Sequence, residues 1–251
     1  MTYLFRDGTF DAAIWQGVEA DYPTLPESFA PGEIVLDVGC HTGAVCDVAA
    51  RRGATVIGYE ANRENHVLAK FNLARHPSVT VRHAAVWRSD VSRSAELVFI
   101  PSANPANTGG GSVMFSIEAE HWQAHAREVG DPDDVEAKLS RHPVESVALD
   151  DVLVELGRVR FLKLDVEGAE FPILLTATRL DLVDAIAGEY HELSDMDMDL
   201  LAPEARVGDT RYAAELLRQR LRAAGFATKF VSSQDGRGLF SAERVTAARG
   251  T

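Results

Sequence analysis

The feature that most constrains this chain is a turn from Gly39 to Gly43, placed between an apolar run and a helical pattern. The run 33–38 predicts a buried strand, and residues 44–52 predict a helix that Gly53 ends. A strand that turns tightly into a helix begins a βα unit, and glycines there let the backbone turn and let a ligand approach the main chain. The turn therefore predicts a parallel sheet with a ligand site at its edge.

The same alternation of strand and helix patterns continues to the end of the chain. Further strands are predicted at 55–60, 79–86, 160–165 and 185–190, and further helices at 64–75, 149–156, 169–178 and 211–224. Two last apolar runs, 227–231 and 238–242, flank Asp235-Gly236 and predict a hairpin. The predicted fold class is α/β, a Rossmann-like doubly wound sheet that is mostly parallel and closes with a C-terminal antiparallel hairpin.

The chain is predicted to form a single domain over residues 1–251. Its 251 residues, 46% of them hydrophobic, suffice for one large core. Residues 1–30 form an N-terminal helical extension, with a helix predicted over 8–22 from the spacing of apolar residues. Residues from about 101 to 145 are polar and contain a predicted helix near 117–129. Because this segment is too short for a core of its own, we expect an insertion over the ligand site.

Charge and cysteine content exclude several classes of protein. With 38 acidic and 25 basic residues, the formal net charge is −13, which repels nucleic-acid phosphates and anionic lipid, so neither is an expected partner. No run reaches the roughly 18–20 apolar residues of a membrane span, and the N-terminus lacks a signal-peptide pattern. Cys40 and Cys46 form no redox or zinc motif. The expectation is a cytoplasmic protein, and the sequence leaves open whether it is a homo-oligomer.

Asp37 narrows the choice of ligand. The spacing here is D-x-G-x-x-x-G, which departs from the G-x-G-x-x-G of dinucleotide sites. A pyrophosphate binds bare amides at a helix N-terminus, and a carboxylate beside it would repel it. A carboxylate suits a cationic ligand instead, and S-adenosylmethionine carries both an ammonium and a sulfonium group. The turn therefore favours S-adenosylmethionine over a dinucleotide.

Glu60 supplies a second signal, because it ends the next strand 23 residues after Asp37. In doubly wound sheets, an acid about 20 residues beyond the glycine turn accepts hydrogen bonds from ribose hydroxyls. Asn65 follows where it could support the loop or cap the next helix. Ala85 ends the third predicted strand, where a small side chain would leave room for a flat base.

Acidic residues also gather after two later strands. They are Asp165, Glu167 and Glu170 after the strand at 160–165, and Glu189 and Glu192 around His191 in the next one. The carboxyl ends of parallel strands share the ligand edge of a sheet, so these side chains are candidates for chemistry. An imidazole titrates near neutral pH, which makes His191 a candidate proton acceptor.

The segments LDVGCHTG, VIGYEANREN, VRHAAV and above all FLKLDVEGAE resemble the FkbM-type family of S-adenosylmethionine-dependent methyltransferases. The resemblance runs from about Glu33 to the C-terminus. It implies a class I methyltransferase fold, with seven strands and a terminal antiparallel hairpin. It also implies O-methylation of a hydroxyl on a sugar or a secondary metabolite. Cys40 and His41 stand where Ala and Asn are expected, which is a departure at the methionine end of the cofactor.

We therefore expect an S-adenosylmethionine-dependent O-methyltransferase acting on a small hydroxylated acceptor. The predicted cofactor-binding residues are Asp37, Gly39, Cys40, His41, Gly43, Glu60, Ala61, Asn65, Ala85 and Asp165. The predicted catalytic residues are His191, Asp165 and Glu189, since an alcohol must lose its proton to a base or at a metal. Without a metal, His191 or Asp165 accepts the proton. Alternatively, Asp165 serves the amino group of the cofactor, and Asp165 and Glu167 divide these two duties between them. In the metal alternative, a divalent cation such as Mg²⁺ is held by Asp165 with Glu189, His191 or Glu192.

The acceptor is expected under the insertion. Gly109–Gly111 would close there as a lid, and the polar residues that could reach acceptor hydroxyls are Asn104, Asn107, Thr108 and Ser112. The aromatic side chains that either add a wall to this site or pack in the core are Phe10, Trp15 and Tyr22.

Two other functions use the same fold. A non-catalytic protein that binds S-adenosylmethionine would keep the glycine turn but would not need acids after both later strands. An NAD-dependent oxidoreductase would share the sheet and Glu60, but the missing G-x-G-x-x-G and the carboxylate of Asp37 oppose it.

Overall fold

The computed structural model describes residues 3–91, 96–100, 102, 104–115, 142–233 and 236–245. The helix predicted near 117–129, most of the predicted insertion and Asp235 of the predicted hairpin turn lie outside the described residues. Within the described ranges, no helix is long and apolar enough to cross a bilayer.

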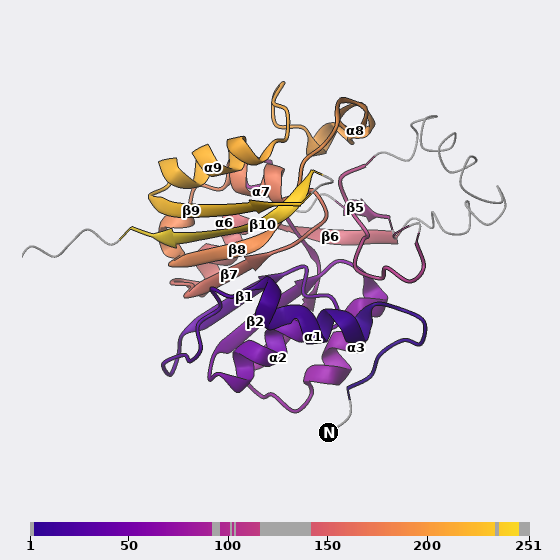
Figure 1. Ribbon diagram of the computed structural model, residues 1–251, viewed down its shortest axis with the longest axis vertical. Helices are drawn as coiled ribbons and strands as arrows, with labels where there is room; N and C mark the ends of the chain where they lie inside the picture. Colours follow the sequence, from indigo (N-terminus) through magenta and orange to yellow (C-terminus); the bar gives the residue numbers. More distant parts are fainter. Residues whose placement is uncertain are drawn as a thin grey trace, which may run out of the picture.

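A seven-stranded sheet forms the centre of the molecule, in the order β3-β2-β1-β7-β8-β10-β9 (Figure 1). Five of its strands pair in parallel, and the other two form an antiparallel hairpin at one edge. The strand bounds are β1 Ile34–Val38, β2 Thr55–Glu60, β3 Val79–His83, β7 Phe161–Leu164, β8 Ala185–His191, β9 Phe226–Ser232 and β10 Arg237–Arg244. This arrangement confirms the predicted fold class. The chain leaves β1 towards β2 on one side and returns at β7 on the other, so the carboxyl ends of β1 and β7 flank the topological switch point.

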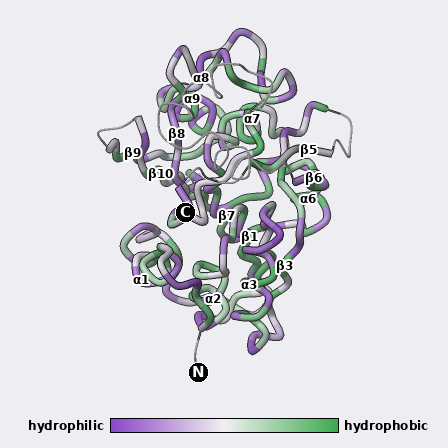
Figure 2. Tube along the Cα trace, turned by 90° about the vertical axis from the view of Figure 1, so that its right-hand side faces the viewer, coloured by the Kyte–Doolittle hydropathy of each residue, from purple (hydrophilic) through white to green (hydrophobic). Residues whose placement is uncertain are grey.

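Helices cover both faces of this sheet because successive strand residues point to opposite sides. Val35 and Phe161 pack into one apolar cluster with the first three helices, whereas Leu36 and Leu162 pack into a second cluster with the later helices. The helices of the first face are α1 Asp11–Asp21, α2 Ala44–Arg51 and α3 Arg63–Leu73, and those of the second are α6 Leu149–Leu156, α7 Glu170–Thr176 and α9 Ala214–Ala223. In Figure 2, α7 lies among the hydrophobic segments, as its burial requires.

A second, three-stranded sheet has the order β4-β6-β5 and was not predicted. Its strands are β4 Ala85–Trp87, β5 Glu96–Phe99 and β6 His142–Ala148. The single strand predicted over 79–86 is wrong, because it breaks at Ala84. His83 still pairs with Glu60 in the main sheet, whereas Ala85 pairs with Ser146 of β6. The chain is thereby redirected beside the carboxyl end of β2.

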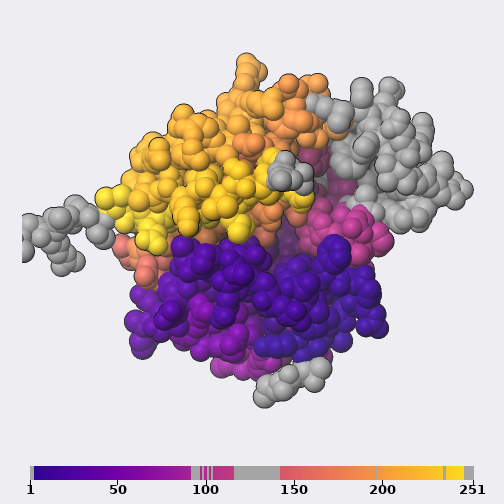
Figure 3. Space-filling model, viewed as in Figure 1, coloured from indigo at the N-terminus to yellow at the C-terminus, as the bar shows by residue number. Residues whose placement is uncertain are grey.

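Three short elements were also not predicted, namely η1 Leu180–Leu182, α8 Asp195–Leu200 and η2 Pro203–Ala205. The N-terminal segment crosses the first face of the sheet and meets the loop 104–112, which connects the second sheet to the site. The amide of Phe10 donates to the carbonyl of Ala106 at 2.9 Å. Figure 3 shows the magenta loop beside the indigo N-terminal segment. Two segments that are far apart in sequence therefore meet at the ligand edge.

Candidate functional site

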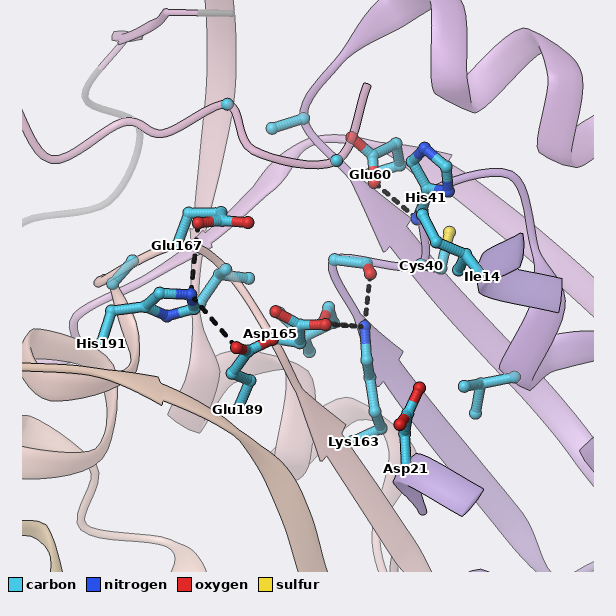
Figure 4. A pocket seen from close by; sticks show the side chains of 18 of the residues that line it. Ile14, Asp21, Cys40, His41, Glu60, Lys163, Asp165, Glu167, Glu189 and His191 are labelled. Atoms are coloured by element: carbon cyan, nitrogen blue, oxygen red, sulfur yellow. Dashed lines mark hydrogen bonds and ion pairs between the residues drawn. The ribbon is translucent and has the colours of Figure 1, made fainter. Parts of the chain in front are cut away.

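A cavity of about 530 Å³ opens at the carboxyl ends of β1, β2, β7 and β8 (Figure 4). The first turn, which follows β1, borders one end, and the acidic residues of β7 and β8 border the other. Helix α1, the hairpin residues Val231 and Leu239 of β9 and β10, and the loop residue Asn107 also line it. The carboxyl edge of the sheet, which the sequence predicted as the ligand edge, therefore holds a cavity of ligand size at the topological switch point.

The first turn, whose Gly39 lines the cavity, packs directly against the carboxyl end of β7. Gly39 has φ 73°, and a Cβ on it would lie 1.9 Å from the carbonyl oxygen of Asp165. Only glycine fits that approach between the two strand ends. The amides of Gly39 and Cys40 both donate to the carbonyl of Tyr59 at 3.0 Å, which fixes the turn on β2.

Glu60 lies beside this turn and is 6% exposed. One carboxylate oxygen accepts a hydrogen bond from the amide of His41 at 2.8 Å, and the other accepts one from the amide of Asn62 at 2.8 Å. Burial raises the pKa of Glu60 to about 7, against the effect of these donors. Each oxygen keeps a lone pair, so the carboxylate is held in one orientation at the cavity wall and still accepts hydrogen bonds from a ligand.

Asp37 does not line the cavity. It is fully buried under the turn, where its Oδ1 lies 3.4 Å from Lys163 Nζ and its Oδ2 accepts from Cys46 Sγ at 3.2 Å. Lys163 also donates to the carbonyl of Gly39 at 2.5 Å. Burial by itself lowers the pKa of Lys163, but Asp37 and Asp165 outweigh burial and raise that pKa above its usual value. The buried cation ties the turn to β7, a role that the sequence interpretation missed although Lys163 precedes Asp165 by two positions.

The clasp, defined as residues 6–11 together with the loop 104–112, covers the outer side of the turn. Thr108 Oγ1 donates to Asp11 Oδ1 at 2.7 Å and lies 2.8 Å from His41 Nε2. Arg6 binds Asp11 through Nε at 2.9 Å and Asn65 through Nη2 at 2.7 Å. Asn65, one of the predicted cofactor residues, also donates to the carbonyl of Thr108 at 2.9 Å. The clasp therefore fastens the loop to the turn through side chains that sequence spacing does not connect.

The clasp places the ion pair of Arg6 and Asp11 beside a neutral His41. Burial lowers the pKa of His41 to about 4, so its imidazole is neutral at pH 7. Burial alone would raise the pKa of Asp11, but hydrogen bonds from Arg6 and Thr108 outweigh it and lower that pKa to about 2. Because Thr108 donates to Asp11, its oxygen is free to accept from the ring N–H of His41.

The second turn, residues 165–168 after β7, carries acidic side chains at the other end of the cavity. His191 Nε2 lies 3.2 Å from Glu167 Oε2 and 3.8 Å from Glu189 Oε1, and its Nδ1 lies 3.5 Å from Glu170 Oε1 (Figure 4 shows the first two contacts). Burial lowers the pKa of His191, but Glu170, Glu167 and Asp165 outweigh burial and raise it to about 10. Burial raises the pKa of Glu167 to about 7. This end therefore holds a cationic imidazole among carboxylates.

Most of the predicted site residues meet at this cavity. Those that line it are Gly39, Cys40, His41, Glu60, Ala61, Asn65, Ala85, Asp165, Glu189 and His191. Two predicted cofactor residues do not. They are Asp37, buried below the turn, and Gly43, which precedes α2 with φ 98° and lies against Leu73. The binding and catalytic roles of all these residues stay predictions.

The metal alternative finds no support in the described part of the chain, where no group of three or more His, Cys, Asp or Glu side chains could hold a metal ion. Asp165 Oδ2 accepts from the Tyr22 hydroxyl at 3.1 Å and lies 3.7 Å from Lys163 Nζ. Glu192 points away from the cavity, since its carboxylate accepts from the amide of Ala214 at 2.7 Å.

Some of the loop and aromatic residues predicted for the acceptor site line the cavity, whereas others hold neighbouring segments in place. Asn107, Gly109, Gly111 and Tyr22 line the cavity. The supporting side chains are Ser112, which donates to the Glu167 carbonyl at 2.8 Å, Asn104, which accepts from the amide of Ala106, and Trp15, which donates to Thr42. Phe10 is half-exposed. The loop therefore contacts both turns.

Comparison with known proteins adds an independent finding. The sequence profile described as the Methyltransferase FkbM domain matches residues 37–227. The ubiquinone biosynthesis O-methyltransferase of Brucella anthropi is 43% identical over 53 residues, which are 21% of this chain and 21% of that enzyme. The match thus spans about a fifth of that relative's length.

Solved structures show more distant similarity. The N-terminal domain of EvdMO1 with S-adenosylhomocysteine bound is 15% identical, with a TM-score of 0.46, and the match covers 96% of this chain and 83% of that chain. The precorrin-6y C5,15-methyltransferase of Geobacter metallireducens is 11% identical, with a TM-score of 0.43, and the match covers 90% of this chain and 88% of that chain.

Proposed function

The chain belongs to the FkbM methyltransferase family, and on that premise we propose that it transfers the methyl group of S-adenosylmethionine to a hydroxyl oxygen of a sugar or secondary metabolite. One observation carries the proposal. A single cavity joins a glycine turn with the Glu60 carboxylate at one end to a group of proton-accepting side chains around His191 at the other. A methyl donor and an acceptor hydroxyl must meet in one place for such a transfer.

The first end of the cavity fits S-adenosylmethionine. The volume of about 530 Å³ lies within the range of small-molecule sites, and Gly39 of the first turn is among the residues that line it. Glu60 would accept from the ribose hydroxyls, while Ala61 and Ala85 leave room for the base. Asp165 would accept from the ammonium group. When bound, S-adenosylmethionine supplies a methyl carbon that is made electrophilic by the attached sulfonium.

The protein's own residues would then orient and deprotonate the acceptor. Methyl transfer is an in-line displacement, so holding the hydroxyl oxygen in line accounts for much of the rate. Asn107 of the loop and Leu239 of β10 line the cavity and could contact the acceptor. The acidic residues of β7 and β8 border the second end of the cavity, where a hydroxyl proton would be accepted.

The test combines ligand binding with turnover. S-Adenosylhomocysteine at about 100 times its Kd should stabilise the wild type by about 2.7 kcal/mol, a rise in Tm of roughly 5–10 °C. Glu60→Ala should lose this shift, and Glu215→Ala, at an exposed position on α9, should keep it. Incubation with S-adenosylmethionine and a panel of monosaccharides, glycosides, alcohols and phenols should release S-adenosylhomocysteine with at least one of them.

Each negative result has a different meaning. A well-folded wild type that shows no shift contradicts the proposed cofactor site. A clear shift without turnover on any hydroxylated compound favours a non-catalytic protein that binds S-adenosylmethionine. A shift with NAD in place of S-adenosylhomocysteine favours the oxidoreductase.

A further inference from the structure

Glu167 has an unusual backbone. In the described chain, His41 and Glu167 are the two non-glycine residues with positive φ, and Glu167 has φ 52°. A non-glycine residue in this left-handed region is uncommon, and such residues cluster at active sites when their surroundings hold them there. The backbone of Glu167 therefore calls for a physical explanation.

Three hydrogen bonds hold this backbone. The amides on either side of Glu167, those of Val166 and Gly168, donate to the two carboxylate oxygens of Glu170 at 2.8 and 2.9 Å. The carbonyl of Glu167 accepts from Ser112 Oγ at 2.8 Å. Glu170 is fully buried, so this support does not compete with water. The surroundings fix the turn and keep Glu167 at the cavity wall.

His191 fixes the Glu167 side chain as well. One carboxylate oxygen of Glu167 lies 3.2 Å from His191 Nε2, and the other points across the cavity in Figure 4. That second oxygen has no hydrogen-bond partner within the described ranges, and 29% of the side chain is exposed. His191 thus holds one carboxylate oxygen of Glu167, and the other oxygen faces the cavity, where it can accept a hydrogen bond.

We propose that Glu167 is the general base that removes the acceptor's hydroxyl proton, and that His191 is a positioning residue that orients Glu167 rather than the base itself. This assignment rests on the proposed function and names which residue of the site does the proton transfer.

The charges around the pair support this division of roles. His191 faces Glu167, Glu170, Glu189 and Asp165, and these carboxylates hold its pKa at about 10 although burial lowers it. At neutral pH the ring already carries its second proton and cannot accept another. Arg237 of β10 lines the same cavity and acts on Glu189.

The carboxyl of Glu167, unlike the His191 ring, has a pKa near neutral pH. Burial raises its pKa to about 7, His191 works against that rise, and Asp165, Glu170 and Glu189 add to it. A base is most effective when its pKa lies near the working pH. Asp165 is the weaker candidate, because under the proposed function its carboxylate binds the ammonium group of the cofactor, and the Lys163 cation lies 3.7 Å from it.

The methyl transfer needs no further reactant. Glu167 takes the hydroxyl proton while an oxygen lone pair of the acceptor forms the new bond to the methyl carbon. The electron pair of the broken carbon–sulfur bond stays on sulfur. Glu167 leaves the step as a carboxylic acid and returns its proton to water.

The first arm of the test needs no acceptor. In ¹³C-labelled protein saturated with S-adenosylhomocysteine, we expect a glutamate carboxyl that titrates near pH 7 and is missing in Glu167→Gln but present in Glu192→Gln. The imidazole of His191 should remain protonated at pH 8. A neutral His191 at that pH, or a Glu167 carboxyl that titrates near 4.5, overturns the assignment.

The second arm measures kcat against pH with an acceptor from the panel. Glu167→Gln should lower kcat about 10²–10⁴-fold at every pH from 6 to 9. His191→Gln keeps a donor but removes the cation, so the acidic limb of the profile should move up by about 1 pH unit and activity should return at high pH. A merely structural role for His191 would not move this limb.

The contrary results separate the two proposals. An active enzyme that loses all activity in His191→Gln and keeps it in Glu167→Gln makes His191 the base. A loss of the acidic limb confined to Glu189→Gln moves the role to Glu189. A protein that binds S-adenosylhomocysteine and turns over no acceptor removes the proposed function, and with it the assignment of any base.

Discussion

The two turns that border the cavity share one backbone feature, a non-glycine residue with positive φ, but this residue has a different role in each turn. The first turn has His41 at φ 51° beside Gly39 and Gly43, and the second has Glu167 at φ 52° beside Gly168. His41 is neutral at pH 7, and its backbone amide holds the Glu60 carboxylate at the cavity wall. Glu167 carries a carboxylate against a cationic His191. A strained residue therefore serves ligand approach in one turn and the placement of a charged group in the other.

The two turns are also supported differently. The first is held from outside by the clasp, through Thr108 and Asp11, and from below by Lys163. The second is held from within by Glu170 and from above by Ser112. Variants that remove one support should therefore affect one end of the cavity and spare the other, except where the two turns touch.

The largest effect is expected at that point of contact, Gly39. In Gly39→Ala a Cβ would lie 1.9 Å from the Asp165 carbonyl, and the residue would also need φ near 73°. Because neither strand can move without breaking the sheet, the loss of unfolding free energy should exceed about 4 kcal/mol, or the protein should not fold. Urea denaturation measures it.

The matched control is Gly32→Ala. Gly32 has φ 87° but nothing within 4 Å of the added Cβ, so the variant should lose only about 1–2 kcal/mol from the left-handed backbone. Equal losses in the two variants would mean that backbone strain alone matters and that the turns are not packed against each other.

Glu170→Gln should weaken the second turn alone. The amide can accept from only one of the two N–H groups that the carboxylate holds, and it removes a buried charge next to His191. We expect a loss of about 3 kcal/mol and a lower pKa for His191, since burial then acts with less opposition. Chemical denaturation and an imidazole titration by NMR measure the two effects.

Affinity for S-adenosylhomocysteine should fall far less in this variant than in Glu60→Ala. Glu192→Gln is the control, because that exposed carboxylate accepts a single N–H from Ala214. A large loss of cofactor affinity in Glu170→Gln would show that the second turn also shapes the first end of the cavity.

Glu60 should make the stability of the ligand-free protein depend on pH. Its pKa is raised from 4.5 to about 7 by burial, so the folded protein binds a proton more tightly than the unfolded chain. The resulting stabilisation is complete below pH 4.5 and is lost as pH rises through 7, by up to about 3 kcal/mol. Glu60→Gln has no such carboxyl, so its stability relative to the wild type should rise between pH 5 and 8.

Urea denaturation of both proteins at several pH values measures this difference. A difference that does not change with pH would mean that the folded protein does not perturb Glu60. The same variant should lose affinity for S-adenosylhomocysteine, because the Gln amide keeps only one of the two accepting oxygens, and each of these already accepts a backbone N–H beside the expected ribose hydroxyls.

The sequence predicts the part of the site formed by the main-sheet strands much better than the part formed by the second sheet and its loop. The strands β1, β2, β7 and β8 are short apolar runs bounded by turns, and the acids at their ends follow from the parallel order of the sheet. The second sheet escapes such analysis, because nothing in the run 79–86 indicates that Ala85 leaves β3 to pair with β6.

The interactions that hold the site are the least predictable part. Arg6, His41 and Thr108 are far apart in sequence, and no spacing rule joins them. Asp37 stands at a position that indicates a ligand contact, yet burial and the ion pair with Lys163 turn it inward. Sequence pattern shows which side chains reach the ligand edge, whereas packing decides which of them face the ligand.

Thr108→Val should give the smallest effect and should confine it to the first turn. The variant keeps the shape of the side chain but removes the hydroxyl that joins Asp11 to His41, so we expect a loss of about 1 kcal/mol in stability. Affinity for S-adenosylhomocysteine should fall about five- to tenfold if the clasp holds the turn in its binding geometry. Thr24→Val is the control, because the buried Thr24 hydroxyl has no hydrogen-bond partner in the described chain, and its loss should be neutral. An acidic limb of the kcat profile that moves in Thr108→Val would contradict the separation of the two turns, because the clasp would then act on Glu167 as well.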